Sequence, residues 1–143
     1  MYFLYTLIYA AALIVLLPFE YLKRPKEIRK RWIREKLGGC PASIKKDVSD
    51  VRVAIHAVSV GEAIAAASLV KALKEKYPHA KTTVFTITDT GQRVAKEKLS
   101  NVAETAYLPF DMPVFIKRCI ENLRPNVFIA METELWPNLF KAL

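Results

Sequence analysis

Glu62 is the residue whose position most directly suggests chemistry. It ends the segment Ser59-Val60-Gly61-Glu62, which follows the apolar run VRVAIHA and precedes a stretch with helical spacing of apolar residues. Free N–H groups and the helix dipole at such a helix start favour an ionised carboxylate. An ionised carboxylate can act as a general base toward a hydroxyl group. The same environment lowers its basicity, so desolvation or a second carboxylate would have to compensate.

The same segment also has an ordinary structural interpretation. Ser59 is a favourable N-cap residue, and a glutamate in the first helical turn stabilises a helix without any catalytic role. Gly61 is expected to allow a sharp turn and the close approach of a ligand. The segment does not carry the glycine-rich fingerprint of a phosphate-binding loop. The catalytic and the capping interpretations both stay open on sequence alone.

Two further carboxylates, Glu132 and Glu134, lie in the segment METELWPNL, after the apolar run NVFIA. Ligands of open parallel sheets bind outside the carboxyl ends of the strands, at the point where the strand order reverses. In the common order 3-2-1-4, strands one and four are neighbours at that point. The sequence therefore predicts that these carboxylates and Glu62 share one crevice, where Glu132 could supply the compensating charge.

The elements that must position these residues alternate between strand and helix. Apolar runs predict strands at 51–57, 82–88, 105–110 and 126–132. Apolar residues at helical spacing predict helices at 62–77, 91–99 and 113–123, and another helix starts near residue 135 or 137. Such alternation with short connections predicts an α/β fold, a doubly wound, Rossmann-like parallel sheet.

The first nineteen residues carry no charged side chain. A helix over residues 1–17 would measure roughly 25 Å, slightly less than a hydrocarbon core of about 30 Å. Flanking aromatic residues can extend it, and the basic stretch KRPKEIRKRWIREK follows it, so the positive-inside rule predicts a cytoplasmic domain. We expect a membrane anchor; the alternative is an amphipathic or buried apolar helix that does not cross the bilayer.

The net charge of +8 is a local feature. Residues 20–46 hold ten of the 22 Lys and Arg residues against three of the 14 Asp and Glu residues, whereas residues 47–143 hold twelve against eleven. This distribution argues against a nucleic-acid-binding face and suits anionic membrane lipids. The two cysteines, Cys40 and Cys119, form no zinc pattern and are expected to be reduced thiols.

These observations predict an anchor at 1–19, a basic segment and linker at 20–50, and a Rossmann-like domain at 51–143. The chain stops inside a helical pattern, LWPNLFKAL, so we expect a further domain. Three other residues have two possible interpretations each. His56 could face the cleft or pack in the core, Trp136 could pack or stack on a sugar, and Asp111 is a turn former or a site residue. We expect His79, Lys117 and Arg118 to be solvated.

Four segments resemble one known family. They are IHAVSVGE (55–62), YPHAKTTVFTITDTGQ (77–92), YLPFDMP (107–113) and METELWPNL (131–139). They are similar to the 3-deoxy-D-manno-octulosonic acid (Kdo) transferases of lipopolysaccharide synthesis. The resemblance implies a GT-B glycosyltransferase with two Rossmann-like domains, located at the bacterial inner membrane. The first domain would receive the lipid A precursor, lipid IVA, and the second would hold most of the CMP-Kdo donor site.

The resemblance also implies roles for single residues. Transfer would invert the anomeric centre without a bound metal or other cofactor. Glu62 matches the general base and Glu132 matches a second essential acid. The substrate-binding positions would be Ser59, Gly61, Thr88, Thr90, Gly91 and Glu134.

One position departs from the family pattern. The family usually has a proline before Thr-Gly in the turn after strand two, where this chain has Asp89 in TDTG. A negative charge there would oppose a phosphorylated acceptor. Without the donor domain we expect the chain to be inactive alone. The alternatives are a non-catalytic, membrane-anchored binding module or a remnant of such an enzyme, and a nucleotide-sugar enzyme with another acceptor.

Overall fold

The computed structural model describes residues 2–41, 51–132, 134 and 136–143. Four parallel strands form one sheet in the spatial order β3-β2-β1-β4. The strands are β1 (Arg52–His56), β2 (Lys81–Thr86), β3 (Glu104–Tyr107) and β4 (Val127–Ala130). The predicted α/β fold class and the predicted strand order are confirmed.

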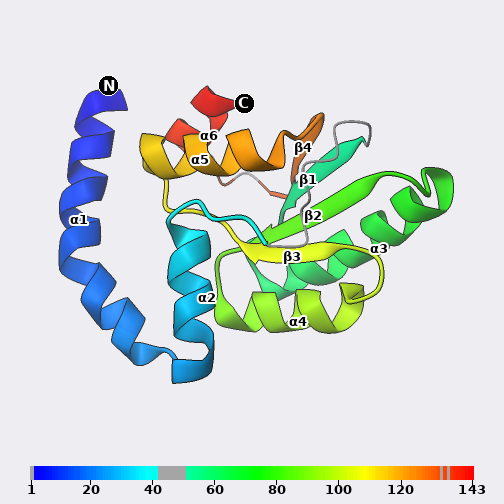
Figure 1. Cartoon of the computed structure of the whole chain (residues 1–143), viewed down its shortest axis with the longest axis horizontal. Helices are drawn as coiled ribbons and strands as arrows, with labels where there is room; N and C mark the ends of the chain where they lie inside the picture. The colour runs from blue at the N-terminus through cyan, green and yellow to red at the C-terminus, as the bar shows by residue number, and fades with distance from the viewer. Residues whose placement is uncertain (1, 42–50, 133, 135) are drawn as a thin grey trace.

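Helices cover both faces of the sheet (Figure 1). Helices α3 (Val60–Lys76) and α4 (Asp89–Leu99) lie on one face, and α5 (Pro113–Leu123) and α6 (Pro137–Ala142) lie on the other. Side chains of β1 alternate between the two layers: Val53 and Ile55 pack into the core under α3 and α4, and Ala54 packs under α5 and α6. Burial on both faces explains why the whole of VRVAIHA contains so few polar residues.

Helices α3 and α4 begin where a polar residue caps them. Helix α3 starts two residues before the predicted boundary because Ser59 is its N-cap, and α4 starts at Asp89 because Thr88 is its N-cap. Strand β4 ends at Ala130 rather than at the predicted residue 132. Helix α5 has the predicted bounds, with its proline in the first turn.

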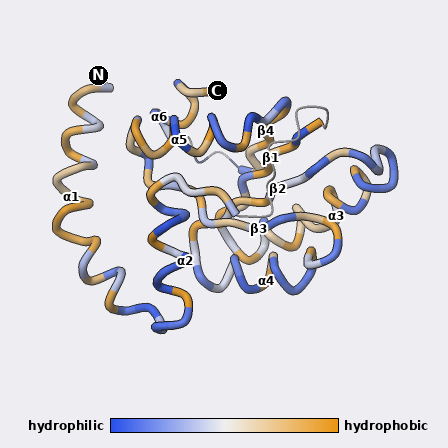
Figure 2. Tube along the Cα trace, in the orientation of Figure 1, coloured by the Kyte–Doolittle hydropathy of each residue, from blue (hydrophilic) through white to orange (hydrophobic). Residues whose placement is uncertain are grey.

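Helix α1 (Tyr2–Lys23) runs past the predicted end of the apolar helix and contains Pro18. None of its residues is buried, most of its length is apolar (Figure 2), and many of its large apolar side chains are exposed. They include Phe3, Leu7, Ile14, Val15 and Phe19. Within the described part of the chain, α1 is the one helix long and apolar enough to cross a membrane.

The basic segment forms a packed helix, α2 (Lys26–Lys36), which the sequence interpretation did not predict. Its residues Glu35 and Arg31 pair with the edge strand β3. The Glu35 carboxylate accepts the N–H of Tyr107 at 2.9 Å, and Arg31 donates to the carbonyl of Thr105 at 2.6 Å. An unpaired strand edge exposes backbone groups that can pair with another chain. Helix α2 therefore completes the sheet as well as carrying basic charge.

The segment after α2 was predicted as a linker. Gly38 has a positive φ of 84°, and a Cβ there would collide with the carbonyl oxygen of Phe115. Residues 42–50 of the predicted linker lie outside the described residues. Cys40 and Cys119 are free, as expected, but their Sγ atoms lie 4.0 Å apart, a proximity that their sequence spacing did not indicate.

Candidate functional site

Glu62 is held by the turn that joins β1 to α3. Its Oε2 accepts the N–H of Val58 at 2.9 Å, and its Oε1 accepts the N–H of Ser59 at 3.1 Å. The Ser59 hydroxyl in turn accepts the N–H of Glu62 at 3.2 Å, which completes a capping box. The capping interpretation of this segment is therefore confirmed. The carboxylate is also fixed at the carboxyl edge of the sheet.

The environment of Glu62 keeps its carboxylate ionised. Partial burial alone would raise its pKa, but the hydrogen bonds from Val58 and Ser59 outweigh burial, and the pKa lies below its ordinary value. The side chain is half-buried, so solvent reaches it. A carboxylate with a lowered pKa can accept a hydrogen bond from a hydroxyl group, but it binds a proton weakly.

The acidic loop, residues 131–136, of which the structure describes Met131, Glu132, Glu134 and Trp136, leaves the same edge of the sheet. Strand β4 pairs with β1 so that Ala130 lies opposite His56, and the N–H of Met131 donates to the carbonyl of His56 at 3.0 Å. Glu132 and Glu134 follow directly and are both exposed. The structure thus brings the start of the acidic loop beside the end of the strand that leads to Glu62.

The turn after β2 lies against the turn after β1. The Thr88 hydroxyl accepts the N–H of Gly91 at 3.1 Å and approaches the carbonyl of Val58 at 3.4 Å. A Cβ at Gly91 would lie 2.9 Å from the Thr88 hydroxyl oxygen, so this position has no room for a side chain. Thr90 is exposed, and its hydroxyl lies 3.4 Å from that of Thr88. The Thr88–Gly91 turn therefore extends the same rim.

The expectation that Gly61 is needed for a sharp turn is wrong. Gly61 lies inside the first turn of α3 and has no positive φ. A Cβ there would meet only the Ser59 hydroxyl at an ordinary 3.8 Å. The turn is made by the extended Ser59, whose φ and ψ are −100° and 172°, so no glycine is needed to form it.

The negative charge of Asp89 is compensated within the fold. Arg24, at the end of the α1–α2 connection, donates to its carboxylate at 3.2 Å, and the hydroxyl of Tyr107 donates at 2.8 Å. The guanidinium of Arg24 also lies over the ring of Trp32 at 4.0 Å. The departure from the family pattern thus forms part of the contact between the basic segment and α4.

His56 is a core residue rather than a solvent-facing one. It is 2% exposed, and its Nε2 has no hydrogen-bond partner among the described residues. Burial lowers its pKa to about 4, against the opposing effect of the Glu62 charge. The imidazole is therefore neutral near neutral pH, which favours the packing alternative.

Trp136 packs against the apolar core under α5 and α6, and its indole N–H is buried without a partner in the described part of the chain. The packing alternative holds here too.

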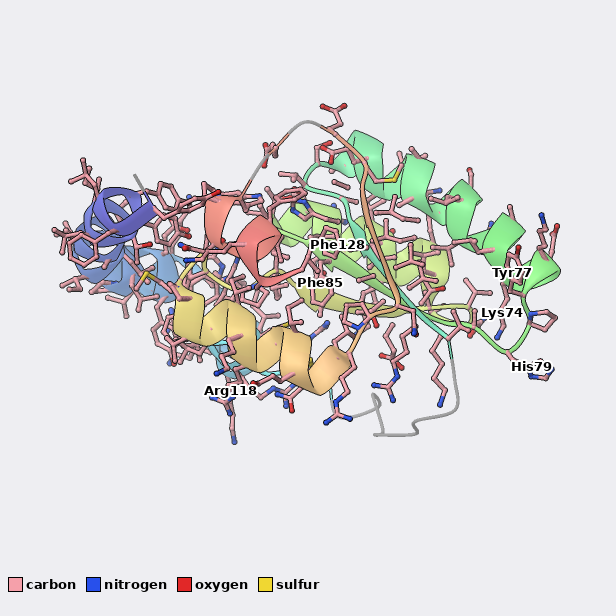
Figure 3. The ribbon with its side chains drawn as sticks, turned by 90° about the horizontal axis from the view of Figure 1, so that it is seen from above. Lys74, Tyr77, His79, Phe85, Arg118 and Phe128 are labelled. Carbon is pink, nitrogen blue, oxygen red and sulfur yellow. The ribbon has the colours of Figure 1, made fainter. Side chains whose placement is uncertain are left out.

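His79, Lys117 and Arg118 are exposed, as predicted. Figure 3 shows Arg118 pointing outward from α5, while Phe85 and Phe128 lie between the sheet and the helices of that face.

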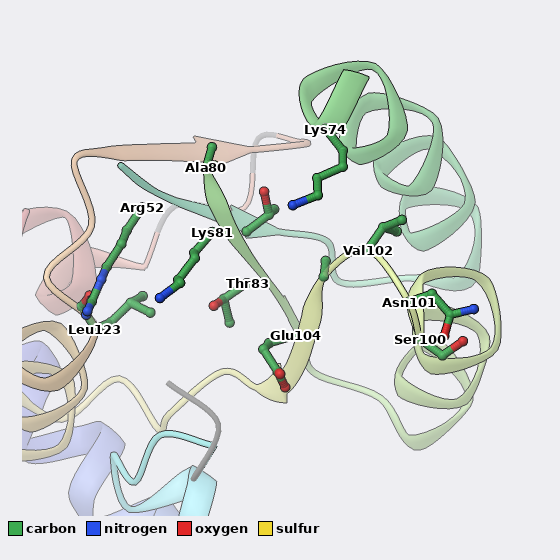
Figure 4. Close-up of a pocket in the computed structure, with 12 residues that line it drawn as sticks. Arg52, Lys74, Ala80, Lys81, Thr83, Ser100, Asn101, Val102, Glu104 and Leu123 are labelled. Carbon is green, nitrogen blue, oxygen red and sulfur yellow. The ribbon is translucent and has the colours of Figure 1, made fainter. Parts of the chain in front are cut away.

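A cavity of about 270 Å³ opens at the opposite edge of the sheet, where the strands begin (Figure 4). Its lining includes Arg52, Lys74, Lys81 and Glu104. None of the predicted site residues lines it. Since ligands of open parallel sheets bind at the carboxyl edge, this cavity is not the candidate site.

The comparisons with known proteins agree with the motifs. The family model described as 3-Deoxy-D-manno-octulosonic-acid transferase (kdotransferase) matches residues 27–143. A 3-deoxy-D-manno-octulosonic acid transferase of Haemophilus influenzae is 47% identical over 89 residues, which are 62% of this chain and 21% of the relative. That of Rickettsia conorii is 32% identical over 108 residues, 73% of this chain and 23% of the relative.

A plant relative also matches. The probable mitochondrial 3-deoxy-D-manno-octulosonic acid transferase of Arabidopsis thaliana is 36% identical over 87 residues, 61% of this chain and 20% of the relative. The chain thus spans between 20% and 23% of the length of these three relatives. No solved structure matches the chain. With a family model that covers residues 27–143, the chain belongs to the 3-deoxy-D-manno-octulosonic-acid transferase (kdotransferase) family.

Proposed function

We propose that this chain is the acceptor-binding part of an enzyme that transfers Kdo from CMP-Kdo to the lipid A precursor in lipopolysaccharide synthesis. One observation carries the proposal: in a chain of this family, the acidic loop starts beside His56 at the edge where Glu62 is held. Most of the CMP-Kdo site would belong to a donor domain in the part of the relatives that this chain does not span. Residues 51–143 would form the acceptor domain.

The proposed reaction is an inverting transfer without a metal. A hydroxyl oxygen of the acceptor forms a bond to the anomeric carbon of Kdo, the bond from that carbon to the phosphate of CMP breaks, and CMP leaves. Glu62 takes the hydroxyl proton. Its lowered pKa keeps it ionised before the reaction but limits its basicity. A bound acceptor that excludes water, together with the negative charge of Glu132 in the loop at the same edge of the sheet, would restore that basicity.

The other predicted site residues would bind substrate. Thr88, Thr90 and the small Gly91 form a polar rim next to the β1 turn, where a sugar or phosphate group could approach. Ser59 and Gly61 are exposed at the start of α3, and Glu134 is exposed in the acidic loop. These roles follow from position and from the family motif.

We further propose that α1 holds the domain at the cytoplasmic surface of the bacterial inner membrane without crossing the bilayer, because Tyr5 and Tyr9 near the start of α1 are hydrogen-bonded to Asp111 of the domain. The support is its exposed apolar face and the basic residues Lys23, Lys26 and Lys30, which are exposed next to it. Lysine near an anionic membrane surface contributes about 1 kcal/mol to binding. A membrane-held enzyme suits an acceptor that is itself a lipid.

A second candidate is a non-catalytic, membrane-anchored binding module. The complete capping box favours it, because both carboxylate oxygens of Glu62 already accept backbone N–H groups and need no catalytic explanation. The two candidates differ in what they predict for a neutral residue at this position.

The test is the Glu62→Gln substitution in the complete protein, assayed for transfer from CMP-Kdo to the lipid A precursor. Glutamine can complete the capping box through its amide oxygen, but it loses the acceptor for one of the two backbone N–H groups that Glu62 holds, so a small loss of stability accompanies the removal of the base. We expect kcat to fall about 10²-fold or more while the protein stays folded at the assay temperature. Glu75→Gln, at an exposed position of the same helix, is the matched control and should transfer at the wild-type rate. Wild-type transfer by Glu62→Gln would refute Glu62 as the base and would favour a non-catalytic role for this part of the enzyme.

A further inference from the structure

Asp111 occupies an unusual place for a residue that the sequence suggested as a turn former. It is 1% exposed. Its carboxylate accepts the backbone N–H of Asn138 at 3.0 Å and that of Leu139 at 2.8 Å. Its backbone carbonyl accepts the side-chain amide of Asn138 at 2.6 Å. A residue that follows β3 therefore holds the start of α6, 27 positions further along the chain.

Helix α6 needs such a partner because its own N-terminus is poorly capped. Its N-cap residue is Trp136, which makes no side-chain cap hydrogen bond, and Pro137 at the first position has no N–H. The first free N–H groups are those of Asn138 and Leu139, and buried N–H groups without acceptors are costly. Asp111 supplies the side-chain oxygen acceptor that a local Asp or Ser would supply at an ordinary N-cap.

The start of α6 is also the end of the acidic loop. At its other end the loop is held by the hydrogen bond from Met131 to the carbonyl of His56. The loop that carries Glu132 and Glu134 is thus held at one end by β1 and at the other by Asp111. A shift at either end would move both carboxylates relative to the turn that holds Glu62.

Asp111 is in turn held by α1. The hydroxyl of Tyr5 donates to its carboxylate at 2.9 Å, and the hydroxyl of Tyr9 accepts its backbone N–H at 3.2 Å. Thr6 extends the contact, with its hydroxyl 3.3 Å from the side-chain oxygen of Asn138. The inward face of α1 therefore reaches the acidic loop through one buried carboxylate.

We propose that Asp111 is a positioning residue for the acidic loop and links α1 to the candidate site. The proposal rests on the proposed function, because it assigns Asp111 an effect that acts through Glu132. It does not require Asp111 to touch a substrate.

The test is a double-mutant cycle in the complete protein, with transfer from CMP-Kdo to the lipid A precursor as the readout. Asp111→Asn keeps the shape of the side chain but removes one of its acceptor oxygens. We expect it to lower kcat at least tenfold in the wild-type background and less than twofold in the Glu132→Gln background. Tyr5→Phe removes the hydroxyl that donates to Asp111 but leaves both oxygens of Asp111 in place to accept the backbone N–H groups of α6. It should lower kcat less than Asp111→Asn does, and again mainly in the wild-type background. It replaces Asp111→Asn in the cycle if that variant does not fold.

Glu35→Gln is the matched control for stability. Glu35 is as buried as Asp111 and also accepts a backbone N–H, but it belongs to α2 and bonds to β3, the edge strand on the opposite side of the sheet from β4. Any effect of Glu35→Gln on kcat should be the same in both backgrounds. Suppose that Glu132→Gln impairs transfer, as the proposed function requires. The positioning role of Asp111 is then overturned if Asp111→Asn lowers kcat equally in both backgrounds, or in neither. If Glu132→Gln alone leaves transfer intact, the proposed function falls, and the positioning role falls with it.

Discussion

His56 makes the stability of this fold depend on pH in a way that can be calculated. The side chain is 2% exposed at the end of β1, and burial lowers its pKa from 6.5 to about 4. Between these values the unfolded chain binds a proton at His56 and the folded chain does not. The free energy of unfolding must therefore decrease as the pH falls through this interval.

The expected size follows from the shift. At about 1.4 kcal/mol per pKa unit, the shift corresponds to about 3 kcal/mol in total, of which about 2 kcal/mol is lost between about pH 7 and about pH 5. Glu62 contributes little in that interval, because stability from a carboxylate with a lowered pKa is lost only below the ordinary value of 4.5. The interval therefore isolates the histidine.

The assay is urea unfolding of the chain in mild detergent, followed by circular dichroism at the two pH values. His56→Asn removes the titrating group but keeps a polar atom near the position of Nδ1, and its free energy of unfolding should change less with pH than that of the wild type, by about 2 kcal/mol. His79→Asn is the control, because His79 is exposed, and it should follow the wild type. If the free energy of unfolding of His56→Asn changes with pH as much as that of the wild type, the conclusion that His56 is buried and neutral is refuted.

Two further predictions concern the contacts of α2 and of the loop after it. Trp32 is 1% exposed and packs edge-to-face on Phe110 with ring centroids 5.7 Å apart, so Trp32→Ala should cost about 3–5 kcal/mol in the same urea assay. A loss below about 1 kcal/mol would show that α2 is not packed on the domain in solution. Cys40 should react with iodoacetamide before Cys119, because a hydrogen bond with Cys119 lowers the pKa of the half-buried Cys40, whereas that bond and burial raise the pKa of Cys119. Mass spectrometry of timed digests measures both rates, and equal rates would contradict this prediction.

The predictable part of the fold is local. Runs such as VRVAIHA identify buried parallel strands, because a strand covered on both faces packs apolar side chains into both layers. The bounds of α5 follow from Pro113 and the helical spacing after it. The spacing of Ser59 and Glu62 predicts the capping box, since both partners lie within one turn. From these elements the placement of Glu62 and the acidic loop at one edge follows by topology.

The less predictable part joins residues that are far apart in the chain. Nothing in the local pattern around Glu35 indicates that it pairs with Tyr107 of an edge strand, 72 positions away. Asp111 looks like a turn residue in PFDMP, yet it caps α6 and accepts a hydrogen bond from Tyr5, 106 positions away. Cys40 and Cys119 are a third pair of this kind. They come together because both lie where the segment after α2 crosses α5.

The sequence by itself determined the four strands of the sheet, the helices that follow them, their order, the family, and the edge at which Glu62 and Glu132 lie. Periodicity and capping act within a few residues and can be read along the chain. Only the tertiary structure decided that the basic segment closes the sheet edge, that Asp89 is neutralised by Arg24, and that Asp111 holds the acidic loop. A buried carboxylate must find its donors wherever the packed chain presents them, and single-sequence patterns do not specify those pairings.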